Sequence, residues 1–447
     1  MNVETNKRTI ISFLDEEYRQ QAANKNYQSI ASYVDGMKPT ARKVMHTVIK
    51  NNLTSWSKVE VLANKTAGET EYLGGSTNIA GVIVTISKGY TTSNNVPMLD
   101  TNGNFGQRLD TKPGEARYIK VRKGAETEKY FNKVDNKILI EQEFEETIVE
   151  PKFFVPTLPF LLLNGSEGMG SGHAQLILPR KLEDVRNYIL TSLNGEEKPS
   201  LNPYFNGFNG TISQGVDSSK WVSEGIYNVS KRTIIITELP VGFSLLQYTK
   251  KLDILIDKKI IKSYIDESDT KTDTYRFKIT VDFKFDLSHD NIINKLHLES
   301  KMAENYTSMD ENNSVKLFKS ASEIMDNYID IKLQYLQKRK DYLTEKTKQD
   351  LLILASKYLF VKNITDGIIT VNKMPKVKIA AQIKLIDKII MVDGTYDYLL
   401  KMPIYSLTEE KLKELLAQIK IKKAELQAIM NKDIKDTWRE EIQEIKC

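Results

Sequence analysis

The stretch DGMKPTARKVMHTVIK, residues 35–50, places a turn and a proline before a basic, amphipathic segment. Proline fits the first turn of a helix, and the apolar residues that follow repeat at the spacing of one helical face. They are Val44, Met45, Val48 and Ile49. The pattern predicts a helix over residues 40–53. Lys38, Arg42 and Lys43 fall before or off the apolar face, where cations and helix amides can reach a phosphate, but a solvated helix start explains this stretch better on its own.

A second helix is predicted to begin near Ser76 or Thr77, since either side chain can cap a helix. The apolar residues that follow recur at helical spacing. They are Ile79, Val82, Ile83 and Ile86. Asparagine and glycine at residues 94–95 and 102–104 indicate turns. Two helices followed by turns and short strands are typical of a winged-helix module.

The rest of the chain changes character twice. Isoleucines within residues 232–237 and alternating apolar residues over 275–285 predict strands, so the middle third is expected to be α+β. In the last third Tyr328, Tyr335 and Tyr342 recur every seven residues, and a second series does the same: Leu412, Ile419 and Leu426. These heptads predict two long helices paired antiparallel as a coiled coil, although a helical bundle explains the periodicity equally well. Ser406 and Glu409 can form a capping box for the second helix.

The composition is that of a folded protein with about three domains. The 447 residues are 40% hydrophobic and 28% charged. The longest apolar run, near residues 160–163, is too short to span a membrane. A single cysteine, Cys447, and four histidines exclude a disulfide framework and a cysteine zinc site, so we expect a cytoplasmic protein that binds no metal itself. The net charge of +5 permits nucleic-acid binding without demonstrating it.

Residues 164–172, NGSEGMGSG, are dense in glycine. Such a stretch lets backbone amides approach a phosphate, but no Lys-Ser or Lys-Thr follows, so it is not a Walker loop. A tight turn between buried strands explains it better on its own. Met169 is the one apolar side chain among these glycines, and proteins that bend DNA insert such wedges between base steps.

Arg117 and Tyr118 follow a turn-rich stretch. A tyrosine hydroxyl can attack a phosphodiester, and a neighbouring cation can stabilise the charge that develops on the phosphoryl oxygens. With 21 tyrosines in the chain, a surface anchor is the more common explanation of the dipeptide alone.

Together and in this order, the motifs resemble the breakage–reunion region of type IIA DNA topoisomerases. Residues 35–39 resemble the family's Asp-Gly-Leu-Lys-Pro helix start, 102–106 its Gly-Asn-Phe-Gly turn, 116–118 its catalytic Arg-Tyr, and 156–172 its Asn-Gly-x-x-Gly-Ile-Gly stretch. Four further segments resemble eukaryotic-type members: residues 204–212, 236–240, 335–341 and 405–408. The resemblance runs from about residue 15 to the C-terminus.

The resemblance implies an α+β multidomain fold. It consists of an N-terminal arm (1–24), a winged-helix domain with the catalytic tyrosine (25–150), an α/β tower domain (151–315), coiled-coil helices (316–356 and 402–447) and a helical exit-gate dimerisation domain (357–401). The layout resembles the medium subunit of the divided type II topoisomerases of T-even-type bacteriophages. We therefore expect the ATPase and the topoisomerase–primase modules on a separate large subunit, which binds ATP and Mg²⁺.

The resemblance also implies residue roles. Tyr118 would be the nucleophile that joins the 5′ phosphate of a cut strand, and Arg117 would stabilise the transition state. Met169 would kink the duplex, and the three cations Lys38, Arg42 and Lys43 would hold its backbone. The expected partners are double-stranded DNA, a second copy of the chain and the large subunit, with no membrane. The alternative is a DNA-binding scaffold subunit that does not cut.

Two departures from the family pattern stand out. The family usually has a His-containing segment where this chain has Tyr72-Leu73-Gly74-Gly75-Ser76, and an arginine where it has Gln28. Two groups that would help to position a phosphate are therefore missing. The chain is therefore expected either to cut more slowly or to use substitutes such as Lys112 or Lys120.

Overall fold

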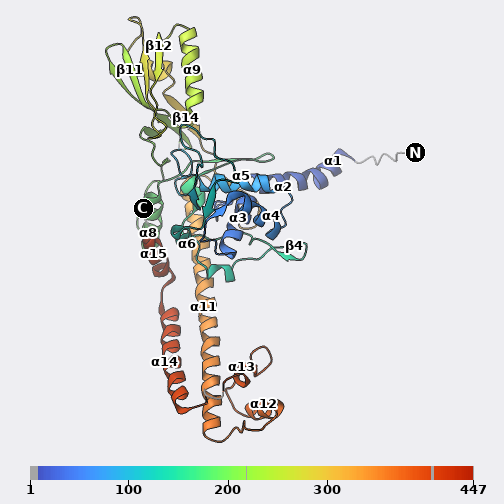
Figure 1. The fold of residues 1–447 in the computed structure, drawn as a ribbon. Coiled ribbons are helices and arrows are strands. Elements are labelled where there is room, and N and C mark those ends of the chain that lie inside the picture. Colours follow the sequence, from blue (N-terminus) through green and yellow to red (C-terminus); the bar gives the residue numbers. More distant parts are fainter. Residues whose placement is uncertain (1–8, 218, 404–406, 446–447) are drawn as a thin grey trace, which may run out of the picture. The chain divides into compact units, whose positions relative to one another are not determined.

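The computed structural model describes residues 9–217, 219–403 and 407–445 (Figure 1). They form two compact units: residues 333–438 make up the second unit and the rest of the described chain makes up the first. Helix α11 (Ala321–Thr365) begins in the first unit and ends in the second. Within these described ranges, every helix is too short or too polar to cross a membrane.

The first unit opens with a helical run. It consists of α1 (Ile10–Phe13), a π-helical turn (Leu14–Tyr18) and α2 (Arg19–Ser29). The run therefore continues past residue 24, where the arm was expected to end, because the last turn of α2 packs into the unit and buries Asn26. Residues 1–8 of the expected arm lie outside the described residues.

Three helices and a small antiparallel sheet follow. They are α3 (Pro39–Lys50), β1 (Ser57–Lys58), α4 (Val59–Glu69), α5 (Ser76–Ser87), β2 (Asp100–Asn102) and β3 (Lys120–Arg122), with strand order β1-β3-β2. The predicted apolar face of α3 is confirmed, since Val44, Met45 and Val48 are fully buried. Helix α4 was not predicted because two of its four buried positions, Ala63 and Thr66, carry small or polar side chains.

The second predicted helix is confirmed as α5, but its predicted cap is wrong. Gly75 occupies the cap position with φ 81°, and neither Ser76 nor Thr77 supplies a capping bond. Glycine adopts this left-handed backbone without steric cost, so the chain enters the helix through backbone geometry instead of a side-chain cap.

The next part of the first unit along the chain contains an apolar run and a hairpin. The elements are α6 (Ala125–Tyr130), a 3-10 turn (Asp135–Lys137), the pair β4 (Glu143–Phe144) and β5 (Thr147–Ile148), then α7 (Phe160–Asn164), β6 (Ser166–Met169), β7 (Ala174–Ile177) and α8 (Leu182–Asn194). Residues 160–163 are buried to 1% exposure or less, so this run forms core. The glycine-rich stretch is an antiparallel hairpin, β6 paired with β7.

The middle third is α+β, as predicted. Its four-stranded antiparallel sheet has the order β10 (Ile226–Ser230), β11 (Thr233–Glu238), β13 (Phe277–Thr280), β12 (Ser263–Asp266). Helices α9 (Leu245–Asp257) and α10 (His289–Lys295) contribute to its apolar core. The strand predicted over 275–285 is shorter than expected, because the chain turns after Val281 and leaves Phe283 77% exposed.

Smaller sheets complete the first unit. One has the order β14 (Glu299–Ala303), β9 (Lys220–Glu224), β8 (Thr211–Gln214), and β15 (Thr307–Met309) pairs with β16 (Val315–Leu317).

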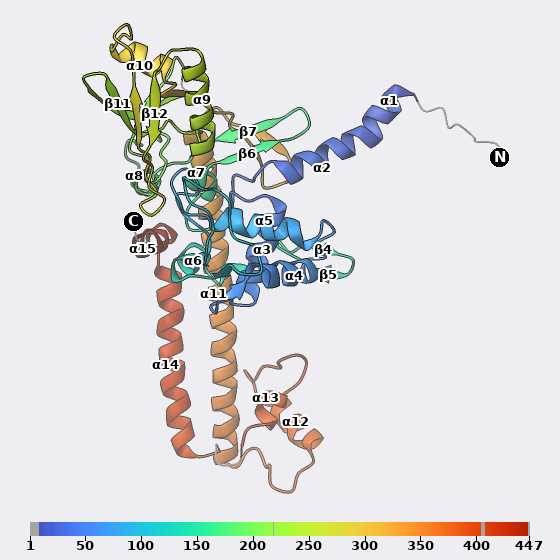
Figure 2. The same cartoon turned by 45° about the horizontal axis from the view of Figure 1, so that its top comes forward.

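The second unit holds two long antiparallel helices, α11 and α14 (Glu409–Asn431), which lie side by side in both views (Figures 1 and 2). Lys422 pairs with Asp350 at 3.6 Å, and Lys340 donates to the Lys432 carbonyl at 2.8 Å. An earlier residue of α11 thus contacts a later residue of the α14 segment, as antiparallel helices require. Between them come α12 (Lys376–Lys384) and α13 (Asp397–Leu400). Ser406 of the predicted capping box lies outside the described residues, and Thr408 caps α14 by accepting from the Lys411 amide.

The second long helix ends earlier than the predicted range, 402–447. Lys432 is extended, the Asp433 carboxylate accepts from the Lys435 amide, and a new helix, α15 (Ile434–Glu444), begins. From Arg439 onward the chain belongs to the first unit, where Arg439 donates to the carbonyl of Leu193 and to the Asn194 side chain.

Candidate functional site

The Arg117–Tyr118 pair lies on the surface immediately before β3. Tyr118 is 70% exposed, and the guanidinium carbon of Arg117 lies 5.2 Å from the centroid of its ring. A tight turn holds the pair, since the Tyr118 amide donates to the Glu115 carbonyl at 2.9 Å and the Ala116 carbonyl accepts from the Glu60 amide. The hydroxyl of Tyr118 is therefore accessible to a large substrate, and a permanent cation accompanies it.

The expected substitute cations flank this tyrosine in sequence. Lys112 is exposed in the loop that leads to Tyr118, and its amide donates to the Asp110 carboxylate. Lys120 lies in β3, two residues after Tyr118, and is partly exposed. Both are within six residues of Tyr118 along the chain, and their role as phosphate ligands stays a prediction.

Met169 lies at the end of β6, in the last register pair of the hairpin, opposite Ala174. Its side chain is 77% exposed although it is apolar. The glycine beside it is explained by packing: a Cβ on Gly168 would lie 2.0 Å from the Ser29 carbonyl oxygen at the end of α2. The glycines therefore let α2 contact the hairpin while Met169 points away from the core.

Lys38 connects the basic helix to this hairpin. Its ammonium donates to the Glu167 carbonyl of β6 at 2.8 Å, and partial burial lowers the pKa of Lys38. Lys43, by contrast, forms an ion pair with Glu150 at 2.8 Å and donates to the Thr70 carbonyl, so its charge is largely neutralised within the protein.

Arg42 is buried instead of lying on the surface, which does not favour the DNA contact predicted for it. The side chain is 2% exposed, and its Nε and Nη2 donate to the two carboxylate oxygens of Asp35 at 2.7 and 3.1 Å. Asp35 also accepts from the amides of Met37 and Phe154. A guanidinium that neutralises a buried carboxylate is a structural group, because moving it to a phosphate would leave that carboxylate unpaired.

The two departures from the family pattern meet in space. Gln28 and the Tyr72–Gly74 segment line one cavity of about 710 Å³, together with Thr40 and Lys43. Residues separated by more than forty positions thus form a single surface beside the basic helix. The two positions at which the chain departs from the family pattern therefore lie at one place.

Sequence reasoning missed a buried arginine in the loop before Tyr118. Arg108 donates through both Nη1 and Nη2 to the Glu238 carboxylate at the end of β11, and it stacks on Tyr275 with its guanidinium carbon 4.5 Å from the ring centroid. The amides of Arg108 and Leu109 both donate to Asp273. In the sequence, Arg108 is only an arginine among turn residues. No periodic pattern there indicates that its side chain is buried.

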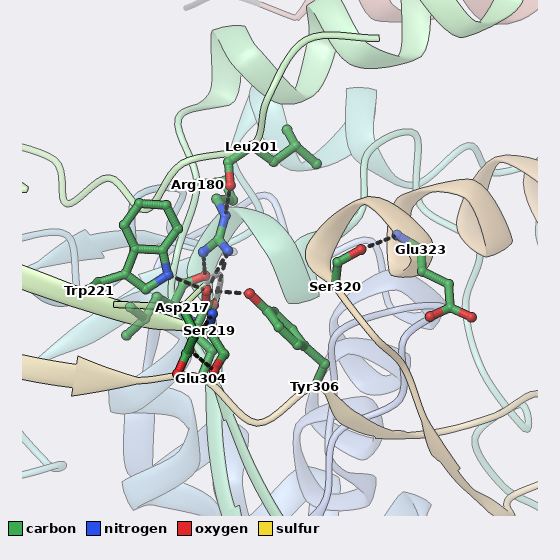
Figure 3. Close-up of polar contacts among 10 residues, drawn as sticks. Arg180, Leu201, Asp217, Ser219, Trp221, Glu304, Tyr306, Ser320 and Glu323 are labelled. Carbon is green, nitrogen blue, oxygen red and sulfur yellow. Dashed lines mark hydrogen bonds and ion pairs between the residues drawn. The ribbon is translucent and has the colours of Figure 1, made fainter. Parts of the chain in front are cut away.

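A second buried network lies at the base of the hairpin. Figure 3 shows Arg180, Trp221 and Tyr306 converging on Glu304. Arg180 donates to both carboxylate oxygens at 3.0 and 2.8 Å, Trp221 Nε1 donates at 2.9 Å and the Tyr306 hydroxyl at 2.7 Å. The carboxylate is therefore saturated, and the network fixes the chain that leaves β7 against β9 and β14.

No group of three His, Cys, Asp or Glu side chains in the part of the chain that the structure describes is close enough to hold a metal ion.

An exposed tyrosine with an adjacent arginine, a protruding apolar residue on a hairpin and a basic helix are the features that the sequence led us to expect of a protein that acts on nucleic acid. The chain belongs to the DNA gyrase/topoisomerase IV family of A-type subunits, whose model matches residues 28–443. It is 29% identical to the mitochondrial DNA topoisomerase 2 of Dictyostelium discoideum and 28% identical to DNA topoisomerase 2 of Saccharomyces cerevisiae, covering 98% and 97% of this chain but only 35% and 34% of those proteins.

A solved structure agrees with this assignment. The DNA-binding, cleavage and re-ligation domain of Plasmodium falciparum topoisomerase II superposes with a TM-score of 0.87 at 28% identity, covering 97% of this chain and 63% of that one. The chain thus spans about a third of the length of the curated relatives.

Proposed function

We propose that this chain cuts and rejoins duplex DNA as part of a type II DNA topoisomerase. The observation that carries the proposal is the 70% exposure of Tyr118 beside the Arg117 guanidinium, in a chain whose fold matches a cleavage and re-ligation domain. The Tyr118 hydroxyl oxygen attacks a backbone phosphorus and forms a phosphotyrosyl bond to the 5′ end. The Tyr118 hydroxyl gives up its proton to solvent, the bond from phosphorus to the 3′ oxygen breaks, and the 3′ oxygen takes up a proton.

The reaction is reversible, because the phosphotyrosyl bond replaces a phosphodiester of similar energy. The 3′ hydroxyl can attack the same phosphorus and release Tyr118. Arg117 stabilises the charge on the phosphoryl oxygens during both steps. Two copies of the chain, each supplying one nucleophilic tyrosine, then open both strands so that a second duplex can pass.

The elements of the fold have matching roles in this proposal. The α3–α5 helices with the β1-β3-β2 sheet form a winged-helix domain, and the α9-containing region forms the tower. Helices α11 and α14 form a coiled coil that carries the dimerisation domain. That domain exposes apolar side chains: Ile368, Met374, Val377, Leu385 and Met391. Exposed apolar residues in this number fit a second copy of the chain as partner.

In this proposal a large partner subunit binds the magnesium and the ATP that the reaction requires. Magnesium bound there would supply electrostatic stabilisation of the reacting phosphate. Met169 acts as an apolar wedge that opens a base step and bends the gate duplex, while Lys38, Lys112 and Lys120 contact the backbone. The host cytoplasm is the proposed location if the protein is encoded by a bacteriophage.

The test is covalent trapping. The chain is mixed with duplex DNA and Mg²⁺, with and without a topoisomerase–primase and ATPase partner, and stopped with detergent. We expect DNA-linked protein that is lost in Tyr118→Phe and kept in Tyr18→Phe, which alters another exposed tyrosine. Salt-dependent DNA binding should survive in both variants. An adduct that persists in Tyr118→Phe would refute the nucleophile, and DNA binding without any adduct would favour the scaffold alternative.

A further inference from the structure

The tip of the β6–β7 hairpin is held by a side chain from a different element. Asn26, in the last turn of α2, accepts from the Ser171 amide at 2.6 Å and donates to the Ser171 carbonyl at 3.2 Å. The Asn26 side chain is only 7% exposed. Its amide thus pairs with both backbone groups of one residue, as a neighbouring strand would.

The packing around this pair leaves little freedom. A Cβ on Gly170 would lie 2.0 Å from Asn26 Oδ1, and a Cβ on Gly168 would lie 2.0 Å from the Ser29 carbonyl oxygen. These two glycines flank Met169. Helix α2 therefore touches the hairpin on both sides of the exposed methionine, and Figure 2 shows the hairpin beside α2.

The second strand of the hairpin, β7, is fixed in the same way. Gln175 accepts from the Ala31 amide at 3.0 Å and donates to the carbonyls of Ala31 and Thr307 at 3.1 and 2.8 Å. It is 1% exposed. Two buried amide side chains, Asn26 at the tip and Gln175 in β7, thus connect the hairpin to α2 and to the residues that follow it.

We propose that Asn26 is a positioning residue for Met169, which fixes the hairpin tip so that the methionine meets the duplex at a defined base step. The proposal rests on the wedge role of Met169 given above. A two-stranded hairpin is marginally stable by itself, and methionine is a flexible side chain, so a wedge built from them needs support from outside. Asn26 supplies it through two hydrogen bonds to Ser171, two residues from Met169.

The experiment measures DNA bending by fluorescence transfer in an end-labelled duplex of about 30 base pairs, a length over which bending is costly. The full chain is used as wild type, Asn26→Ala, Met169→Ala and the double variant. Asn24→Ala is the matched control, because Asn24 is exposed and lies on the same helix. We expect Asn26→Ala to lower the bent population about tenfold with little change in duplex affinity, consistent with the loss of two hydrogen bonds.

The double variant separates positioning from general destabilisation. If Asn26 acts through Met169, then Asn26→Ala has no further effect on bending in the Met169→Ala background, whereas independent effects would add. Asn26→Asp, which keeps the acceptor for the Ser171 amide and loses the donor, should fall between wild type and Asn26→Ala. Thermal unfolding of each variant identifies loss of the fold.

The outcomes distinguish this inference from the proposed function. If Asn26→Ala bends DNA as well as the wild type does, or if the two effects add in the double variant, the role of Asn26 is overturned. The cleavage proposal would still stand. Absence of both bending and a Tyr118 adduct in the wild type would remove the proposed function, and the inference with it.

Discussion

Arg108 donates two hydrogen bonds to the carboxylate of Glu238, and both side chains are at most 9% exposed. The pair joins the loop that leads to Tyr118 with the end of β11 in the four-stranded sheet. The same arginine stacks on Tyr275, and its amide donates to the Asp273 carboxylate, so an ion pair, a ring contact and a hydrogen bond hold this loop at one point. Ten residues later the chain presents Tyr118.

We therefore expect Arg108→Ala to lower the free energy of unfolding by about 3–5 kcal/mol, since it leaves the Glu238 carboxylate buried and unpaired. Urea unfolding measures the change. The matched control is Arg276→Ala, whose exposed pair with Glu267 should contribute about 1 kcal/mol or less. Equal losses in the two variants would contradict the structural role of Arg108.

Arg42 and Lys112 should separate stability from DNA binding. Arg42→Ala should cost about 3–5 kcal/mol because it leaves the buried charge of Asp35 unpaired. Lys112→Ala should leave stability within about 0.5 kcal/mol and lower the slope of log affinity against log salt by about 0.9, as expected for one lost phosphate contact. A stable Arg42→Ala variant with a reduced salt slope would instead support a surface role for Arg42.

Met169→Ala should reduce duplex bending and Tyr118 adduct formation together, because both depend on an opened base step. Fluorescence transfer and detergent trapping measure the two effects. Val216→Ala is a suitable control, since Val216 is an exposed apolar residue in the turn between β8 and β9. Unchanged bending in Met169→Ala would exclude the wedge.

The stability of the protein should fall in mild acid through His46. Burial lowers the pKa of His46 to about 4, and Lys50 and Lys43 act in the same direction against Glu69. An unfolded histidine titrates near 6.5, so between pH 6.5 and about 4 the unfolded chain binds a proton that the native chain does not. The free energy of unfolding therefore decreases as pH falls through this window, by at most about 1.4 kcal/mol per pH unit.

His46→Asn should flatten this dependence, as measured by urea unfolding at a series of pH values. The same slope in the variant and the wild type would show that other groups cause the acid sensitivity.

Self-association should depend on the apolar residues of the second unit. Val377 and Leu385, on or directly after α12, are 80% and 85% exposed. Val377→Asp with Leu385→Asp should shift the chain from dimer to monomer in sedimentation, because each places a charge in an apolar interface. Val216→Asp should leave the dimer intact. A monomeric wild type would contradict the proposed dimerisation domain.

Periodicity in the sequence was enough to locate the helices α3, α5, α11 and α14, since apolar side chains recurring at three, four or seven residues can share a buried face in only one way. The family also followed from the ordered motifs around Asp35, Tyr118 and Met169. Helix α4, the early end of α14 at Asn431 and the turn after Val281 were missed, because each depends on packing or capping by small or polar residues.

The tertiary structure alone decided which polar residues face inward. Arg42 and Lys38 lie four residues apart in one basic stretch, yet one neutralises a buried carboxylate and the other supports the hairpin. The hydrogen bonds between Asn26 and Ser171 join positions 145 residues apart, and no local sequence pattern indicates either partner. Local periodicity is read from neighbours along the chain, whereas the partner of a buried polar group is set by contacts between distant segments, and the need to satisfy that group then fixes the geometry of the site.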